Sequence, residues 1–292
     1  MDLKLLQQHE MNLLQQIVRI CDTAHIDYWL TGGSMLGAVK YKGMIPWDDD
    51  IDVSMKRADY DRFIVAANSH FQSNDRYDVI SDLTDHDYGI TWAKIVDNQT
   101  RIKEDFSFSS KTVFVDIIPL DNVADKPLTR FWDKNIFHIV DQLVKERYSD
   151  GDHRGVMKVF FDLAHTMTKN MSLAQLKRLR YRIMTRHNDT STTKLMNYAS
   201  WYAFGREWVH AAEVKKLQAV PFNDTKIKIP AGAAAILKRM YGDIHRTPSA
   251  AEQQSKHIQA FKVVPIDKKT AHRSLPIDNY FETQHLDTFA RE

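Results

Sequence analysis

Cysteine is nearly absent from the 292-residue sequence, in which Cys21 stands alone. A single cysteine excludes an intramolecular disulfide and a Cys-rich zinc site, and it fits a reducing compartment. No apolar run approaches the length of a membrane span. The start of the chain mixes Gln, Glu and Arg into its apolar positions, unlike a signal peptide. These absences predict a cytoplasmic protein.

A large net charge is also missing, because the balance is only +2. The charges are nevertheless uneven: residues 1–125 have an excess of acids, and residues 126–216 have an excess of bases. An acidic front half suits a metal site. A basic middle suits an anionic partner such as a nucleotide phosphate, a polyanionic acceptor or a membrane surface. A solvated charged face on ordinary helices explains the same basic residues.

The composition is that of a globular protein, with 43% hydrophobic and 27% charged residues. Apolar periodicity predicts the following elements. The helices expected are 3–25, 35–39, 58–71 and 231–241, and the strands are 28–31, 50–53, 77–81, 89–97, 113–120 and 225–230. Residues 126–219 read as helical, and the polar tail from Ser249 onward is expected to be partly loose.

Four carboxylates crowd into five positions after a glycine turn and a short helix, as Asp48, Asp49, Asp50 and Asp52. In the strand pattern Asp50-Ile51-Asp52-Val53, side chains two apart share a face, so Asp50 and Asp52 point the same way. Two such carboxylates repel each other unless a cation or protons lie between them. Mg²⁺ is the natural cation because it prefers hard oxygen ligands. The alternative is a solvated acidic loop.

The glycine turn itself, Gly32-Gly33-Ser34, precedes a helix and offers free backbone N–H groups that suit a phosphate. Asp49 is expected to be solvated or to orient its neighbours.

A further acid, Asp116, interrupts the apolar strand VFVDIIPL. A lone acid there is costly unless it is paired or binds a metal. If the strands place it beside Asp50 and Asp52, three carboxylates converge in an arrangement suited to phosphoryl transfer. The alternative is an acid at the exposed end of the strand. Lys94, in the preceding strand, is positioned to meet a phosphate or to serve as a surface lysine.

The run GGSMLGAVKYKGMIPWDDDID resembles the LicD family of phosphotransferases, which is similar to the fukutin-related group. These families belong to the nucleotidyltransferase superfamily, whose pattern falls here on Gly33, Ser34, Asp50, Asp52 and Asp116. Further similar pieces are VDIIPLD, KIKIP and YGD. The resemblance covers residues 28–121 and again 225–257.

The resemblance implies an α+β fold, with a nucleotidyltransferase-like mixed β-sheet flanked by helices and an inserted or appended helical region. We expect a catalytic core at 1–125, a basic helical region on the acceptor side at 126–220, and a strand-helix segment with a polar tail at 221–292. The implied enzyme transfers a phospho-headgroup, phosphocholine or a similar phospho-alcohol, from a CDP-linked donor to a sugar hydroxyl of a cell-surface glycan or teichoic-acid precursor. It releases CMP and depends on Mg²⁺, with Mn²⁺ as the alternative ion.

Each candidate site residue has one predicted class of role. The predicted catalytic residues are Asp50, Asp52 and Asp116, the same three with Asp48 are the metal ligands, and the substrate-binding residues are Gly32, Gly33, Ser34, Lys42, Arg57 and Lys94. The acceptor is expected to be lipid-linked, with peripheral contact to the inner face of the membrane through the basic helices.

Two other functions fit the residues. One is a nucleotidyltransferase that releases pyrophosphate, and the other is a catalytically dead glycan-binding module. The basic middle also suits nucleic acid, but no stacking motif or known binding fold supports that partner.

Overall fold

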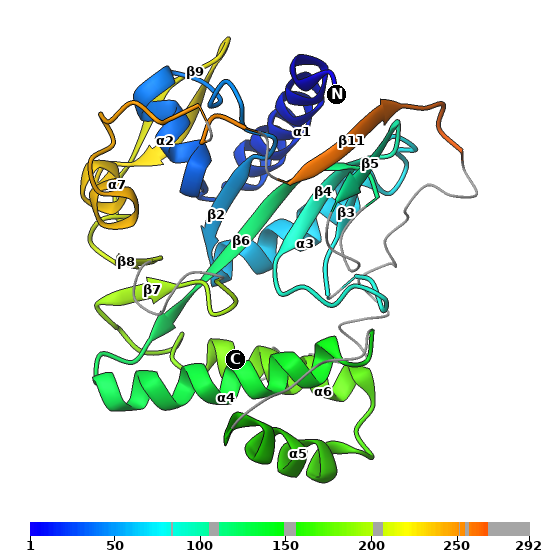
Figure 1. Ribbon diagram of the computed structural model, residues 1–292, viewed down its shortest axis with the longest axis vertical. Helices are drawn as coiled ribbons and strands as arrows, with labels where there is room; N and C mark the ends of the chain where they lie inside the picture. Colours follow the sequence, from blue (N-terminus) through cyan, green and yellow to red (C-terminus); the bar gives the residue numbers. More distant parts are fainter. Residues whose placement is uncertain are drawn as a thin grey trace.

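The computed structural model describes residues 1–82, 84–104, 111–148, 156–200, 207–250, 252–254 and 257–267, with only the backbone described at 156–160. Its largest sheet has the strand order β1-β2-β6-β4-β3, and β7 and β8 extend it from the far half of β6 (Figure 1). The strands of this sheet are β1 (Trp29–Leu30), β2 (Asp52–Lys56), β3 (Tyr77–Ile80), β4 (Ala93–Asp97), β6 (Val113–Val123), β7 (Lys194–Met196) and β8 (Trp208–His210). β2 and β6 run parallel, and the other neighbours in the sheet are antiparallel.

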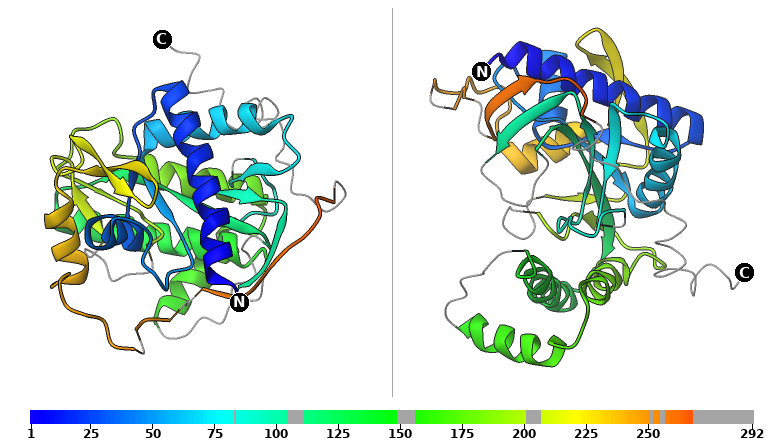
Figure 2. Two further views of the ribbon diagram at one scale, coloured as in Figure 1. Left: turned by 90° about the horizontal axis from the view of Figure 1, so that it is seen from above. Right: turned by 90° about the vertical axis from the view of Figure 1, so that its right-hand side faces the viewer.

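Helices cover the sheet and form a separate layer at one end of it. Helix α1 (Leu3–Ala24) packs across the sheet because Leu6, Leu13 and Ile17 bury one face completely. The other helices are α2 (Gly32–Tyr41), α3 (Arg57–Phe71), α4 (Pro127–Lys145), α5 (Val156–Thr168), α6 (Leu173–Thr185) and α7 (Ala233–Tyr241). Helices α4, α5 and α6 lie together at the end of the molecule away from α1 (Figure 2).

Two smaller antiparallel pairs complete the fold. β9 (Leu217–Phe222) and β10 (Thr225–Pro230) form a hairpin that packs beside β1 and α2. β11 (Ile258–Val263) pairs with β5 (Thr100–Glu104), so the late chain returns to the edge of the core (Figure 1). In the described part of the chain, no helix combines the length and apolarity needed to cross a membrane.

The mixed α/β architecture and most of the predicted elements are confirmed, and the strand at 225–230 has the bounds that its alternation predicted. The nucleotidyltransferase-like detail and the three-part division at 125 and 220 stay predictions. Three local predictions were wrong. Gly32–Ser34 is the first turn of α2, β2 begins only at Asp52, and the stretch 126–219 ends in strands.

The errors have local causes. β7 and β8 are each three residues long, too short to show a period, and they form because β6 extends far enough to pair with them. β11 was missed because only Ile258 of its residues is fully buried, and its backbone pairing with β5 holds a largely exposed strand in place.

A buried arginine joins the helical layer to the core. Arg180 of α6 is fully buried, and its guanidinium donates to Asp141 of α4 at 2.7 Å and to Asp82 near β3 at 3.1 Å. It also donates to the backbone oxygen of Gly89 at 2.8 Å. A buried charge held by partners on three segments fixes how those segments lie against one another.

Replacement of this arginine should destabilise the protein strongly. Arg180→Ala removes the buried guanidinium that bridges Asp141 and Asp82, and we expect the free energy of unfolding to fall by about 3–5 kcal/mol. Arg182→Ala, on the exposed face of the same helix, is the matched control and should change it by less than about 0.5 kcal/mol. Urea denaturation monitored by circular dichroism measures both, and equal effects would contradict the anchoring role.

Candidate active site

Two of the predicted acids lie opposite each other on neighbouring strands. β2 pairs with β6 in parallel, and the register sets Asp52 beside Asp116. The backbone N–H of Asp116 also donates to the oxygen of Ile51 at 3.0 Å. Register partners on adjacent strands project from the same face of a sheet. The two carboxylates therefore come together although Asp52 and Asp116 are 64 positions apart in the sequence.

Lys94 lies on the other side of Asp116, on β4. It is the register partner of Asp116, and its Nζ is 3.0 Å from Asp116 Oδ1. The lysine side chain is only 4% exposed and packs over the ring of Phe114. The predicted phosphate-binding lysine is thus a buried ion-pair partner that balances one of the acids.

The first turn of α2 faces the acids. Ser34 Oγ accepts a hydrogen bond from the backbone N–H of Asp52 at 2.9 Å. Gly32 has a φ of +54°, and a Cβ added there would lie 3.1 Å from Asp52 Oδ2. A Cβ at Gly33 would lie equally close to Asp48 Oδ2. The two glycines therefore let both carboxylates approach the positive end of the helix dipole.

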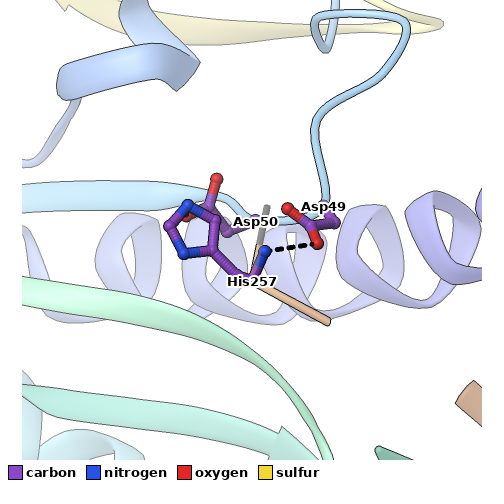
Figure 3. A group of neighbouring side chains, drawn as sticks. All are labelled: Asp49, Asp50 and His257. Atoms are coloured by element: carbon purple, nitrogen blue, oxygen red, sulfur yellow. Dashed lines mark hydrogen bonds and ion pairs between the residues drawn. The ribbon is translucent and has the colours of Figure 1, made fainter. Parts of the chain in front are cut away.

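Asp49 is buried rather than solvated, which corrects half of the expectation for it. Its Oδ2 accepts hydrogen bonds from the backbone N–H groups of His257 and Ile258 at 3.0 and 2.7 Å (Figure 3). This brings the His257 side chain beside Asp50, with Nε2 3.6 Å from Asp50 Oδ2. His257 was missed because a lone histidine in a polar tail carries no motif, and 207 positions separate it from Asp50.

The metal ligands predicted from sequence are Asp48, Asp50, Asp52 and Asp116, and they are not gathered within one tight shell. Among the described residues, a group of three has ligand atoms that all lie within 4.8 Å of one another, and its members are Asp49, Asp50 and His257. The metal roles predicted from sequence therefore stay predictions.

The pKa values of the acids show how strongly they interact. Burial, together with Asp50 and Asp49, raises the pKa of Asp48 to about 8. Burial also raises the pKa of Asp52, with Asp50 and Asp116 adding to the effect. The pKa of Asp50 is raised by burial and pulled back by His257. A cluster that resists ionisation in this way favours either bound protons or a bound cation.

Lys42 and Arg57 are not brought to these acids. Lys42 follows the last turn of α2, about 15 Å along the helix from Gly32 at 1.5 Å per residue. Arg57 begins α3 past the far end of β2 and is buried against Asp121, to which it donates at 2.9 and 2.8 Å. The guanidinium of Arg57 also lies over the aromatic rings of Tyr60 and Tyr181. The geometry gives Arg57 a structural contact, and substrate binding by either residue stays a prediction.

The part of the chain that carries these acids resembles a known protein family. Residues 25–151 match the family described as LicD/FKTN/FKRP, nucleotidyltransferase domain. This part of the chain is therefore similar to the LicD-family domain. It is 28% identical over 269 residues to the lipopolysaccharide cholinephosphotransferase LicD of Haemophilus influenzae, covering 85% of this chain and 93% of that protein. This similarity supports an enzyme of the phosphotransferase class.

Shorter matches fall on other relatives. The ribitol 5-phosphate transferase FKRP of Homo sapiens is 44% identical over 39 residues, which is 13% of this chain and 8% of that protein. The uncharacterized protein RP689 of Rickettsia prowazekii is 46% identical over 35 residues, or 12% of this chain and 13% of that protein.

The metal-free protein should lose stability as the pH rises from about 4 to about 8. In this window the folded state keeps a proton on Asp48, whereas an unfolded carboxyl with a pKa of about 3.9 has released it. The unfolded state then binds fewer protons, so the free energy of unfolding falls with rising pH. Added Mg²⁺ should restore stability most at the alkaline end. Melting temperatures across the window measure this, Asp48→Asn should flatten the trend, and a rising melting temperature would contradict it.

Proposed function

We propose that this protein transfers phosphocholine, or a similar phospho-alcohol, from a CDP-linked donor to a sugar hydroxyl of a cell-surface glycan precursor, and that CMP is released. The named relative that aligns with most of the chain is a lipopolysaccharide cholinephosphotransferase, which supports this donor headgroup and a glycan acceptor. The observation that carries the proposal is the pairing of Asp52 with Asp116, because it assembles an acidic centre from two separate motifs.

The residues present fit a divalent cation, for which we propose Mg²⁺. Asp50 and Asp52 would hold the ion, which would supply charge neutralisation for the diphosphate. Buried carboxylates with raised pKa values are the groups whose mutual repulsion such an ion removes.

Transfer requires one bond to form and one to break. The acceptor oxygen bonds to the phosphorus that carries the headgroup, the bridging P–O bond breaks, and the negative charge leaves on CMP. Asp116 would take the proton of the acceptor hydroxyl. Its ion pair with Lys94 would orient that carboxylate and offset negative charge that develops beside it.

The acceptor side is proposed to lie toward the helical layer. Exposed apolar side chains follow α4 at helical spacing, and they are Leu128, Phe131, Trp132 and Ile136. Phe131 and Trp132 also stack edge to face at 5.8 Å. An exposed apolar stripe with aromatic residues, in a region rich in basic residues, suits the interface of a membrane that carries a lipid-linked acceptor.

Product analysis tests the reaction. The purified protein is incubated with Mg²⁺ and CDP-choline, CDP-ribitol or CDP-glycerol, together with a glycan acceptor, and the nucleotide products are separated. We expect CMP from at least one donor. Pyrophosphate from a nucleoside triphosphate would instead support the nucleotidyltransferase alternative. Glycan binding without any nucleotide turnover would support the inactive binding module.

Replacement of the Asp52 carboxylate by a neutral amide should abolish turnover without unfolding the protein. We expect Asp52→Asn to lower kcat by about 10²–10³, the scale seen when one electrostatic stabiliser is removed. Asp59→Asn on α3, which breaks a partly exposed ion pair with Arg62, is the matched control and should keep activity. Near wild-type CMP release by Asp52→Asn would remove the acidic centre from the mechanism.

Membrane contact should depend on the aromatic pair of α4. The double variant Phe131→Ser, Trp132→Ser should lower co-sedimentation with anionic phosphatidylglycerol vesicles several-fold, because it removes apolar area that enters the interface. Val65→Ser, an exposed apolar position on α3, is the control. Vesicle binding that is equal for all three proteins would show that α4 does not contact the membrane.

A further inference from the structure

A histidine from the late part of the chain lies against the acidic loop. His257 directly precedes β11, and its Nε2 is 3.6 Å from Asp50 Oδ2. Figure 3 shows the imidazole ring beside the Asp50 carboxylate. This separation is longer than a hydrogen bond, so the two groups are neighbours that leave a gap between them.

The backbone around His257 is held by hydrogen bonds on both sides, which fixes the position of its Cα beside the acidic loop. Before β11, the N–H groups of His257 and Ile258 donate to Asp49 Oδ2. After β11, the N–H of Val264 donates to the oxygen of Gln99 at 2.8 Å. β11 itself is paired with β5 between these two points. The chain thus presents the imidazole to Asp50 from a held strand.

The spacing of the two ligand atoms suits one shared ion. Oxygen and imidazole ligands lie about 2.1 Å from a first-row divalent cation, so two ligands of one ion are at most about 4.2 Å apart. The 3.6 Å between His257 Nε2 and Asp50 Oδ2 falls within that limit. A carboxylate oxygen of Asp49 belongs to the same group, whose ligand atoms lie within 4.8 Å of one another, and a small side-chain shift would bring it inside that limit.

A second observation points to positive charge at the same place. Glu10 of α1 is 1% exposed, and among the described residues neither of its carboxylate oxygens has a hydrogen-bond partner. One turn earlier, Gln7 donates to the backbone oxygens of Ile45 and Asp48, which holds the acidic loop against α1. The charges of Asp50 and Asp49 act on Glu10 and, after burial, are the largest causes of its raised pKa. A buried carboxyl without a partner beside further acids is costly unless a cation compensates it.

We propose that His257 and Asp49 join Asp50 and Asp52 as ligands of the divalent cation, and that this mixed oxygen and nitrogen set binds Mn²⁺ more tightly than the Mg²⁺ that also supports the reaction. Mg²⁺ is bound mainly by oxygen ligands, whereas imidazole suits first-row transition ions. The inference rests on the proposed function for what the ion does in catalysis, but not for its binding. The ion would also compensate the charge of the buried Glu10, which is not one of its ligands.

Pulsed electron paramagnetic resonance of bound Mn²⁺ tests the proposal directly. The full chain is stripped of metal, loaded with Mn²⁺ and examined for ¹⁴N modulation from a coordinated imidazole. We expect this modulation in the wild type. We expect His257→Ala to lose it and to bind Mn²⁺ at least about 10-fold more weakly, because even groups behind the ligands cost 10–100-fold when removed. Mg²⁺ should displace Mn²⁺ more readily from the variant than from the wild type.

His245→Ala removes an exposed histidine of the same part of the chain and is the matched control, which should keep the modulation and the affinity. Circular dichroism checks that each variant is folded. Should His257→Ala fail to fold, the wild-type spectrum still decides: bound Mn²⁺ without ¹⁴N modulation overturns the proposal, as does the absence of Mn²⁺ binding. Modulation that survives in His257→Ala also overturns it.

The proposed function fails independently of this result. If no CDP-alcohol yields CMP while Mn²⁺ binds with the nitrogen signal, the function is wrong and the metal site stands. If CMP is released and bound Mn²⁺ shows no nitrogen coupling, the function stands and His257 is not a ligand.

Discussion

The parallel pairing of β2 with β6 is the constraint from which the site follows. This ladder sets Asp52 beside Asp116, and the next ladder sets Lys94 on the opposite side of Asp116. Because backbone hydrogen bonds fix the register, a slip of one residue would turn each of these side chains to the other face of the sheet. The chemistry is therefore held by the same bonds that hold the core.

Charge compensation is the second constraint, and different acids meet it in different ways. Asp116 is balanced by Lys94, and Asp49 is satisfied by two backbone N–H groups. Asp48 and Asp52 face the positive end of α2, which the glycines leave open to them. Burial still raises the pKa of both. Because the negative charge of this cluster is only partly compensated, the cluster favours a bound cation, which would accompany the diphosphate.

The sequence was informative where its signals were local. The two-residue alternation and the glycines gave the acidic motif, and an acid inside an apolar strand singled out Asp116. The match of residues 25–151 to a LicD-family domain agrees with the resemblance drawn from those motifs. The same signals could not show that Lys94 forms an ion pair with Asp116 or that Arg57 is buried against Asp121, since cross-strand partners depend on register. His257 and Glu10 lay beyond sequence reasoning altogether, because each reaches the acids only through packing of a distant element.

The capping of Asp49 by the N–H groups of His257 and Ile258 also imposes an order on assembly. The acceptor and the first donor are separated by 208 positions, so the ribosome must add that many residues before the cap can close. Throughout that interval the nascent acidic loop has its carboxylates next to one another with the Asp49 cap still missing. A growing chain thus completes its charge-dense centre only once residues 257 and 258 have been added, well after the strands beneath it are available to pair.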